Sequence, residues 1–113
     1  MENCLFCKII AGEIPSEKVY EDDEVLAFKD INPMAPVHIL IIPKKHIDGA
    51  DELNDSNAAV TAKIFTVISK LAKEFNLDNG FRVVTNVGSD GGQTVRHLHF
   101  HLLGGTQLRT ELC

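Results

Sequence analysis

The chain carries the stretch His97-Leu98-His99-Phe100-His101-Leu102-Leu103, in which histidine alternates with apolar residues. Successive side chains of a β-strand point to opposite faces, so the three histidines should share one face and the apolar residues the other. We therefore expect a strand over residues 98–103, closed by Gly104-Gly105, with its apolar face in the core. A chance alternation on a half-exposed strand is the plain alternative.

The spacing of the three histidines limits what they can do together. Neighbouring imidazoles on a strand can bind a metal ion, or they can attack and hold a phosphoryl group. A rise of about 3.3 Å per residue places the Cα atoms of His97 and His101 about 13 Å apart. That separation argues against one shared tetrahedral ion and favours separate tasks for the three side chains.

Hydrophobic patterns elsewhere predict several short strands. Residues 17–21 and 25–28 flank an acidic turn and indicate a hairpin. Residues 37–42 lie between two prolines and indicate a buried strand. Residues 81–86 indicate a further strand, which runs into the loop 88–92 with its three glycines.

One long helix is also expected. Asp55 or Ser56 is predicted to cap its start, and Asn79-Gly80 follows its end. A core-facing stripe with helical spacing is formed by Val60, Ile64, Val67, Ile68, Leu71 and Phe75. Four or five strands with one main helix predict an α+β class with an antiparallel sheet, as a single domain over residues 1–113.

Composition excludes several classes of protein. The 113 residues include 11 Lys and Arg against 16 Asp and Glu, a formal net charge of −5. That balance argues against a nucleic-acid binder, which needs a basic surface. No apolar run is long enough to span a membrane, and the N-terminus lacks the pattern of a signal peptide. We therefore expect a cytoplasmic protein with neither a nucleic acid nor a membrane as its partner.

Cys4 and Cys7 have the C-x-x-C spacing of a zinc or redox site. In a reducing compartment such thiols are free or metal-bound rather than part of a disulfide framework. The segment lacks the preceding strand of a thioredoxin motif, which argues against redox chemistry. Zinc ligation and two packed thiols remain as alternatives. No role is expected for the terminal Cys113.

Several stretches together resemble one known family. Residues 97–103 match the alternating histidine signature of the histidine triad (HIT) superfamily. The resemblance extends over nearly the whole chain, through Cys4–Ser16, Phe28–Pro33, Ala35–His46 and Asn86–Val95. Together these stretches resemble the Hint branch, the purine nucleoside phosphoramidate hydrolases. The resemblance implies an antiparallel sheet of about five strands, one long helix, a short N-terminal helix and a two-fold homodimer.

The resemblance also implies catalytic roles. His99 matches the nucleophile that attacks the α-phosphorus of a purine nucleotide and forms a nucleotidyl-histidine. The main-chain carbonyl of His97 matches the acceptor that orients this nucleophile. His101 and the hydroxyl of Thr94 match groups that hold the phosphate oxygens or the leaving group.

Further residues match positions around the nucleotide. Asp30 matches a carboxylate that accepts hydrogen bonds from the ribose hydroxyls, although taken alone it is a typical turn residue. Asn86 and the N–H groups around Gly92 and Gln93 match the surroundings of the phosphate. His38 matches a histidine behind the nucleophile, and a satisfied core histidine describes it equally well. An apolar wall around the base is implied at Leu5, Phe6, Ile9, Phe28 and Ile31.

For the cysteine pair, the resemblance implies a structural Zn²⁺. Two thiolates and two imidazoles would hold it in a closed tetrahedral site with no open position for substrate. The implied ligands are Cys4, Cys7, His46 and His97. No organic cofactor is expected.

Three functions therefore remain as hypotheses. The first, which we favour, is hydrolysis of the P–N bond in purine nucleoside 5′-phosphoramidates. The second is hydrolysis of dinucleoside polyphosphates or nucleotidyl transfer, and the third is a non-catalytic nucleotide-binding interaction module. Transferase branches of the superfamily have glutamine in place of the third histidine, so His101 argues against them.

Overall fold

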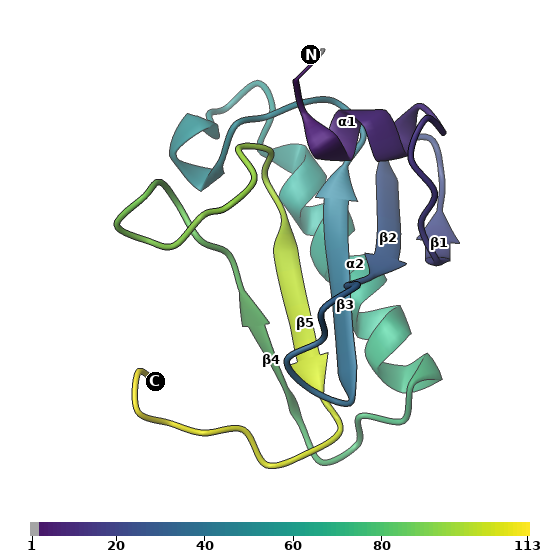
Figure 1. The fold of residues 1–113 in the computed structure, drawn as a ribbon, viewed down its shortest axis with the longest axis vertical. Helices are drawn as coiled ribbons and strands as arrows, with labels where there is room; N and C mark the ends of the chain where they lie inside the picture. Colours follow the sequence, from purple (N-terminus) through teal and green to yellow (C-terminus); the bar gives the residue numbers. More distant parts are fainter. Residues whose placement is uncertain (1–2) are drawn as a thin grey trace.

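The computed structural model describes residues 3–113, and Figure 1 shows their arrangement. The elements in chain order are α1 (Leu5–Ile10), β1 (Lys18–Glu21), β2 (Val25–Lys29), β3 (Val37–Pro43), the 3-10 helix η1 (Ala50–Glu52), α2 (Ala59–Glu74), β4 (Phe81–Val84) and β5 (Phe100–Gly104).

The five strands form one sheet in the order β1-β2-β3-β5-β4, and every neighbouring pair is antiparallel. The predicted strand 37–42 corresponds to β3, which extends one residue further and includes Pro43. It is the central strand, and every residue after Val37 is buried. The structure thus confirms the predicted α+β class, with a five-stranded antiparallel sheet, one long helix and a short N-terminal helix.

Each face of the sheet carries one helix. In Figure 1, α2 lies behind the sheet and α1 crosses the upper end of its front. Side chains such as Ile39 and Leu102 pack with the apolar stripe of α2, whereas Leu26 and Leu40 pack with Phe6 of α1. Alternation along each strand therefore divides the core into two layers, because neighbouring residues face opposite helices.

The start of α2 differs from the prediction. Ala58 is the N-cap residue, and no side chain caps the first turn. The predicted caps, Asp55 and Ser56, lie in the preceding turn. There the Ser56 hydroxyl donates to the Asn54 side chain at 2.6 Å, so it does not reach the helix. A local side-chain bond has replaced the cap.

The end of α2 also comes earlier than Asn79-Gly80. Asn76 adopts the left-handed region at φ 59°. The N–H of Asn76 donates to the carbonyl of Lys73 at 3.2 Å, and the N–H of Leu77 donates to that of Ala72 at 2.9 Å. These are the two bonds of a Schellman motif, whose left-handed position is usually glycine and sometimes asparagine.

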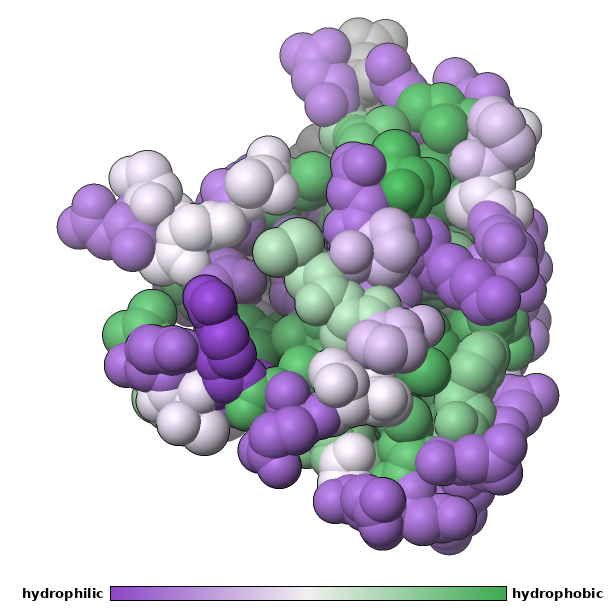
Figure 2. Space-filling model, turned by 60° about the horizontal axis from the view of Figure 1, so that its bottom comes forward, coloured by the Kyte–Doolittle hydropathy of each residue, from purple (hydrophilic) through white to green (hydrophobic). Residues whose placement is uncertain are grey.

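Two large aromatic side chains remain at the surface. Phe65 on α2 is 49% exposed, and Phe81 on the edge strand β4 is 45% exposed. Figure 2 brings the lower end of the molecule forward and shows apolar surface in the middle of this face, with hydrophilic side chains around it. No helix within residues 3–113 has the length and apolar character needed to cross a membrane.

Candidate functional site

The three histidines of residues 97–103 lie on the face of the sheet opposite α2. Leu98 and Phe100 pack into the core layer beneath α2, while the ring of His99 lies edge-on against Phe6 of α1. The strand itself is shorter than predicted, because β5 begins at Phe100 and the first two histidines precede it. The N–H of Leu98 instead donates to the carbonyl of Ile47 at 2.6 Å, which keeps the alternation in place.

His99 is buried and held in one orientation. Its Nδ1 lies 2.6 Å from the carbonyl oxygen of His97, and since a carbonyl can only accept, Nδ1 carries the proton. The lone pair of the neutral ring is therefore on Nε2. Burial lowers the pKa of His99 below its ordinary value, partly offset by the bond to His97. A neutral imidazole with a free Nε2 lone pair can act as a nucleophile at neutral pH.

A chain of hydrogen bonds leads from the main chain to His101. The N–H of Met34 donates to Nδ1 of His38 at 3.0 Å, so the proton of His38 is on Nε2. That Nε2 lies 2.9 Å from Nδ1 of His101, which therefore accepts. The proton of His101 is left on Nε2. Burial, followed by the nearby His99 and His38, lowers the pKa of His101 to about 4, so at neutral pH it is an uncharged donor.

Asp30 lies at the edge of this chain. One carboxylate oxygen accepts from the N–H of Asn32 at 2.8 Å, which is the turn-forming bond expected of an isolated aspartate. The other oxygen lies 3.4 Å from Nε2 of His38. Asp30 lines a small hollow of about 140 Å³ together with His38. The carboxylate therefore makes the turn and also faces the histidine cluster.

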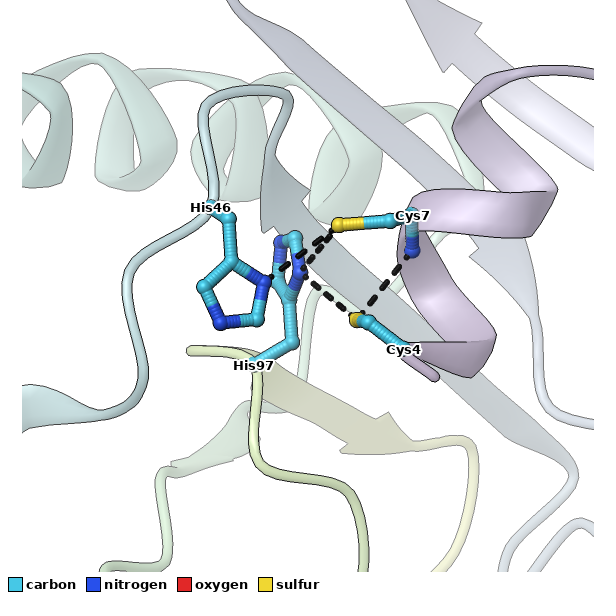
Figure 3. A group of neighbouring side chains, drawn as sticks. All are labelled: Cys4, Cys7, His46 and His97. Atoms are coloured by element: carbon cyan, nitrogen blue, oxygen red, sulfur yellow. Dashed lines mark hydrogen bonds between the residues drawn. The ribbon is translucent and has the colours of Figure 1, made fainter. Parts of the chain in front are cut away.

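A second cluster joins the cysteine pair to two histidines, as Figure 3 shows. Cys4 and Cys7 approach from the N-terminal end of α1, and the two imidazoles face them. Nδ1 of His97 lies 3.3 Å from the Cys4 sulfur and 3.6 Å from the Cys7 sulfur. Nδ1 of His46 lies 3.3 Å from the Cys7 sulfur. The four atoms all lie within 4.8 Å of one another, so this group can hold a metal ion.

Each imidazole of this cluster has an acceptor behind it. Nε2 of His97 donates to the carbonyl of Pro43 at 2.9 Å, and Nε2 of His46 donates to the carboxylate of Asp48 at 2.7 Å. Both Nδ1 lone pairs are therefore directed at the sulfurs, the arrangement typical of metal-ligating histidines. Tetrahedral zinc, with bonds of about 2.3 Å to sulfur and about 2.0 Å to nitrogen, places these atoms about 3.5 Å apart, close to the distances found.

Asp30, His38 and His101 also bring three possible ligand atoms within 4.8 Å, but their chemistry differs. A metal bound to Nε2 of His38 would require the proton of that ring on Nδ1. A proton on Nδ1 of His38 would point at the N–H of Met34, which already donates to this atom. The group is therefore suited to a hydrogen-bond chain rather than to a metal.

The glycine-rich loop is closed by its own hydrogen bonds. Gly92 donates to the carbonyl of Ser89 at 3.1 Å, and the main-chain N–H of Gln93 donates to the carbonyl of Gly88 at 2.9 Å. Both N–H groups that the resemblance placed near the phosphate are thus used inside the loop. The amide of Asn86 likewise donates to the loop, at the carbonyl of Gly91. Thr94 is exposed.

The residues implied as an apolar wall separate into two groups. Phe6, Ile9 and Phe28 are buried, and the rings of Phe6 and Phe28 meet edge to face at 5.6 Å. Leu5 is 44% exposed and Ile31 is 90% exposed. The structure therefore brings Phe6 next to His99 but leaves Ile31 free of the core. A separate hollow of about 720 Å³ lies between residues 76–82 and the C-terminal tail, and no histidine lines it.

Three groups of the site were not found from the sequence. Asp48 lies two residues after the candidate ligand His46, and a carboxylate at that spacing indicates a possible hydrogen-bond partner for the imidazole. The carbonyl of Pro43 and the N–H of Met34 belong to the main chain, so no residue type indicates them.

Comparisons with known proteins identify the family. A family model described as the HIT domain matches residues 11–108. The chain belongs to the HIT family. This HIT protein is 46% identical over 104 residues to protein HitA of Neisseria gonorrhoeae, covering 92% of this chain and 97% of that protein.

Solved structures of HIT proteins agree with the fold. A HIT family hydrolase from Clostridium thermocellum superposes with a TM-score of 0.97 at 50% identity, covering 100% of this chain and 99% of that one. A histidine triad nucleotide-binding protein from Candida albicans gives a TM-score of 0.81 at 37% identity, covering 95% and 84%. The predicted membership of the histidine triad superfamily is thereby confirmed.

Proposed function

We propose that this HIT protein hydrolyses the P–N bond of purine nucleoside 5′-phosphoramidates through a nucleotidyl-His99 intermediate. The observation that carries the proposal is the state of His99. Its ring is buried, its Nδ1–H is held by the carbonyl of His97, and its Nε2 keeps a free lone pair. The relatives described as a hydrolase and as a nucleotide-binding protein support the same chemistry.

In the first step Nε2 of His99 attacks the α-phosphorus. The new P–N bond to His99 forms while the bond to the leaving nitrogen breaks, and the electron pair of that bond goes to the leaving nitrogen. Water gives this nitrogen a proton and becomes hydroxide. The amine then leaves, and splitting the displacement in this way replaces one hard step by two easier ones.

In the second step the hydroxide attacks the same phosphorus. The bond to Nε2 of His99 breaks, its electron pair returns to the imidazole, and a nucleoside monophosphate is released. Throughout, the Nε2–H of His101 and the hydroxyl of Thr94 hold phosphoryl oxygens, and Asp30 accepts from the ribose hydroxyls. His38 keeps His101 in the donor tautomer through the 2.9 Å bond.

We also propose that Cys4, Cys7, His46 and His97 hold a structural Zn²⁺. Two sulfur and two imidazole ligands form a set that suits zinc, and four protein ligands leave no position for substrate. When bound, the ion supplies folding free energy rather than chemistry. Burial and the neighbouring Cys4 raise the pKa of the Cys7 thiol to about 11, so a metal ion would be needed to keep that thiolate at neutral pH.

The homodimer that the resemblance implies remains part of the proposal. The apolar stripe of α2 does not need a partner, because Ile64, Val67 and Leu71 are buried against the sheet of the same chain. The exposed Phe65 and Phe81, together with the edge of β4 that pairs with no strand of residues 3–113, are the surface that a second copy would cover. We therefore propose that the protein is a cytoplasmic dimer in which each chain is a single domain.

The test compares two substrates on the intact protein. We expect a fluorogenic adenosine 5′-phosphoramidate to be hydrolysed with a higher kcat/KM than diadenosine tetraphosphate. Mass spectrometry of the quenched reaction should find the adenylyl group on His99. In His99→Ala, AMP binding should persist while kcat falls by several orders of magnitude, because the covalent route is lost. Retention of more than about a tenth of kcat would exclude His99 as the nucleophile.

The non-catalytic alternative has its own signature. A nucleotide-binding module would bind AMP and leave both substrates intact. Faster hydrolysis of diadenosine tetraphosphate would instead favour the polyphosphate hydrolases.

A further inference from the structure

The side chain of Gln93 makes four hydrogen bonds. Its oxygen accepts from the N–H of Gly88 at 2.9 Å and from Nη1 of Arg96 at 2.7 Å. Its nitrogen donates to the carbonyls of Asp48 at 2.8 Å and of Val95 at 3.0 Å. A carboxamide has two donors and two acceptor positions, so this one is fully used. The side chain is therefore committed to the protein and is not free to bind substrate.

These bonds connect two parts of the site that are far apart in sequence. Gly88 begins the glycine-rich loop, and Asp48 belongs to the segment that carries His46. The carboxylate of Asp48 also accepts from Nε2 of His46 at 2.7 Å. Gln93 thus joins the glycine-rich loop to the residue that orients a candidate ligand of the Cys/His cluster.

The other bonds of the loop do not attach it to that segment. Among residues 3–113, they run within residues 86–93, from Asn86 to Gly91, from Gly92 to Ser89, and from the main chain of Gln93 to Gly88. They close the loop on itself. Its connection to the segment around Asp48 is made by the carboxamide of Gln93.

The space around this carboxamide is also limited. A Cβ atom at Gly49 would lie 2.5 Å from Nη1 of Arg96 and 3.3 Å from the side-chain oxygen of Gln93. The same guanidinium donates to the carboxylate of Asp51 at 2.9 Å, which restricts its retreat. Gly49 has an extended backbone that any residue can adopt, so the need for glycine here is one of space.

We propose that Gln93 is a positioning residue whose carboxamide fixes the loop 88–92 and couples it to metal binding at the Cys/His cluster. The coupling runs in four contacts. A metal on Nδ1 of His46 would fix its ring, and the ring holds the carboxylate of Asp48. The main-chain carbonyl of Asp48 accepts from the carboxamide of Gln93, whose oxygen accepts from the N–H of Gly88. The proposal rests on the proposed function for the statement that this loop faces the phosphate. The new element is that metal binding at the Cys/His cluster and the conformation of the loop 88–92 affect each other.

Amide hydrogen exchange measures the coupling without substrate. Exchange of the Gly88 N–H, followed by NMR in the intact protein, is compared with added Zn²⁺ and with a chelator. In the wild type we expect removal of zinc to accelerate this exchange about tenfold or more, because the acceptor on Gln93 loses its support. In Gln93→Ala the exchange should be fast in both states and should no longer respond to zinc.

Kinetics give a second measurement, with Gln107→Ala in the exposed tail as the matched control. We expect Gln93→Ala to lower kcat on the adenosine phosphoramidate by about 10- to 100-fold, the usual effect of losing an outer partner, with little change in KM. Gly49→Ala should act in the same direction without changing the loop, because its Cβ would displace the Arg96 guanidinium that donates to the carboxamide and would crowd the carboxamide oxygen. Gly49→Ala also provides the kinetic test if Gln93→Ala does not fold.

The outcomes separate this inference from the proposed function. The role of Gln93 is overturned if zinc does not change the exchange rate of the Gly88 N–H in the wild type. It is also overturned if Gln93→Ala and Gly49→Ala both have the same kcat as Gln107→Ala. Zinc-dependent exchange without any phosphoramidate turnover supports the coupling and removes the proposed function alone.

Discussion

The carbonyl oxygen of His97 accepts a hydrogen bond from Nδ1 of His99 at 2.6 Å, while the imidazole of the same residue lies 3.3 Å from the sulfur of Cys4. The main chain of His97 thus orients the proposed nucleophile, and its side chain belongs to the proposed metal site. The two functions can be separated by mutation, because replacing the side chain leaves the carbonyl in the chain.

His97→Ala should therefore lose metal and stability before it loses chemistry, whereas His101→Ala should do the opposite. A structural zinc supplies folding free energy, so loss of one of four ligands should lower the melting temperature. The measurements are elemental analysis of untagged protein purified without chelator, thermal melting and phosphoramidate turnover. Full zinc content in His97→Ala, or no zinc in the wild type, would contradict the four-ligand site.

The cysteines offer a matched pair for the same question. Cys4→Ser should resemble His97→Ala in zinc content and melting temperature. Cys113→Ser, at an exposed position of the tail, should resemble the wild type in both. Equal behaviour of the two serine variants would return Cys4 and Cys7 to the alternative of packed thiols.

The hydrogen bonds also predict the tautomer of every histidine. His99 should be protonated on Nδ1, and the other four on Nε2, because each of those has an acceptor at Nε2 or a donor at Nδ1. Nitrogen-15 NMR of the imidazoles at neutral pH distinguishes the two forms. An Nδ1–H tautomer at His38 would contradict the chain that begins at Met34.

Stability should fall as the pH falls from about 6.5 to about 4. Burial lowers the pKa of His101 to about 4 from an ordinary value of 6.5, so in this interval the unfolded chain binds a proton that the folded chain does not. Thermal melts across this range test the expectation. His101→Gln, which has no titrating ring, should show a weaker dependence, and an unchanged slope would exclude this histidine as a source of the effect.

Oligomeric state is tested at the edge strand. Phe81→Asp should yield monomers by light scattering at micromolar concentration, because a carboxylate cannot be buried in an apolar interface without a partner. Met34→Asp places the same charge at another exposed apolar position and should leave the dimer intact. A monomeric wild type would rule the dimer out.

The sequence predicted the local patterns well and the long-range partners poorly. The alternation around His99 placed its ring on the correct face, because the two-residue period depends on neighbours alone. The start of α2 was wrong, since nothing in the pattern showed that Ser56 would bond to Asn54. The carbonyl of Pro43 lies 54 residues from its partner His97, and such main-chain groups have no signature in a sequence.

The double use of His97 has a practical consequence for inhibitor discovery. A compound that removes zinc or alkylates Cys4 would lower the melting temperature without entering the nucleotide site, as expected for His97→Ala. Such compounds would appear as inhibitors in a turnover screen run near the lowered melting temperature, and raising the substrate concentration would not displace them. A counter-screen with added zinc and excess thiol would separate them from competitive ligands.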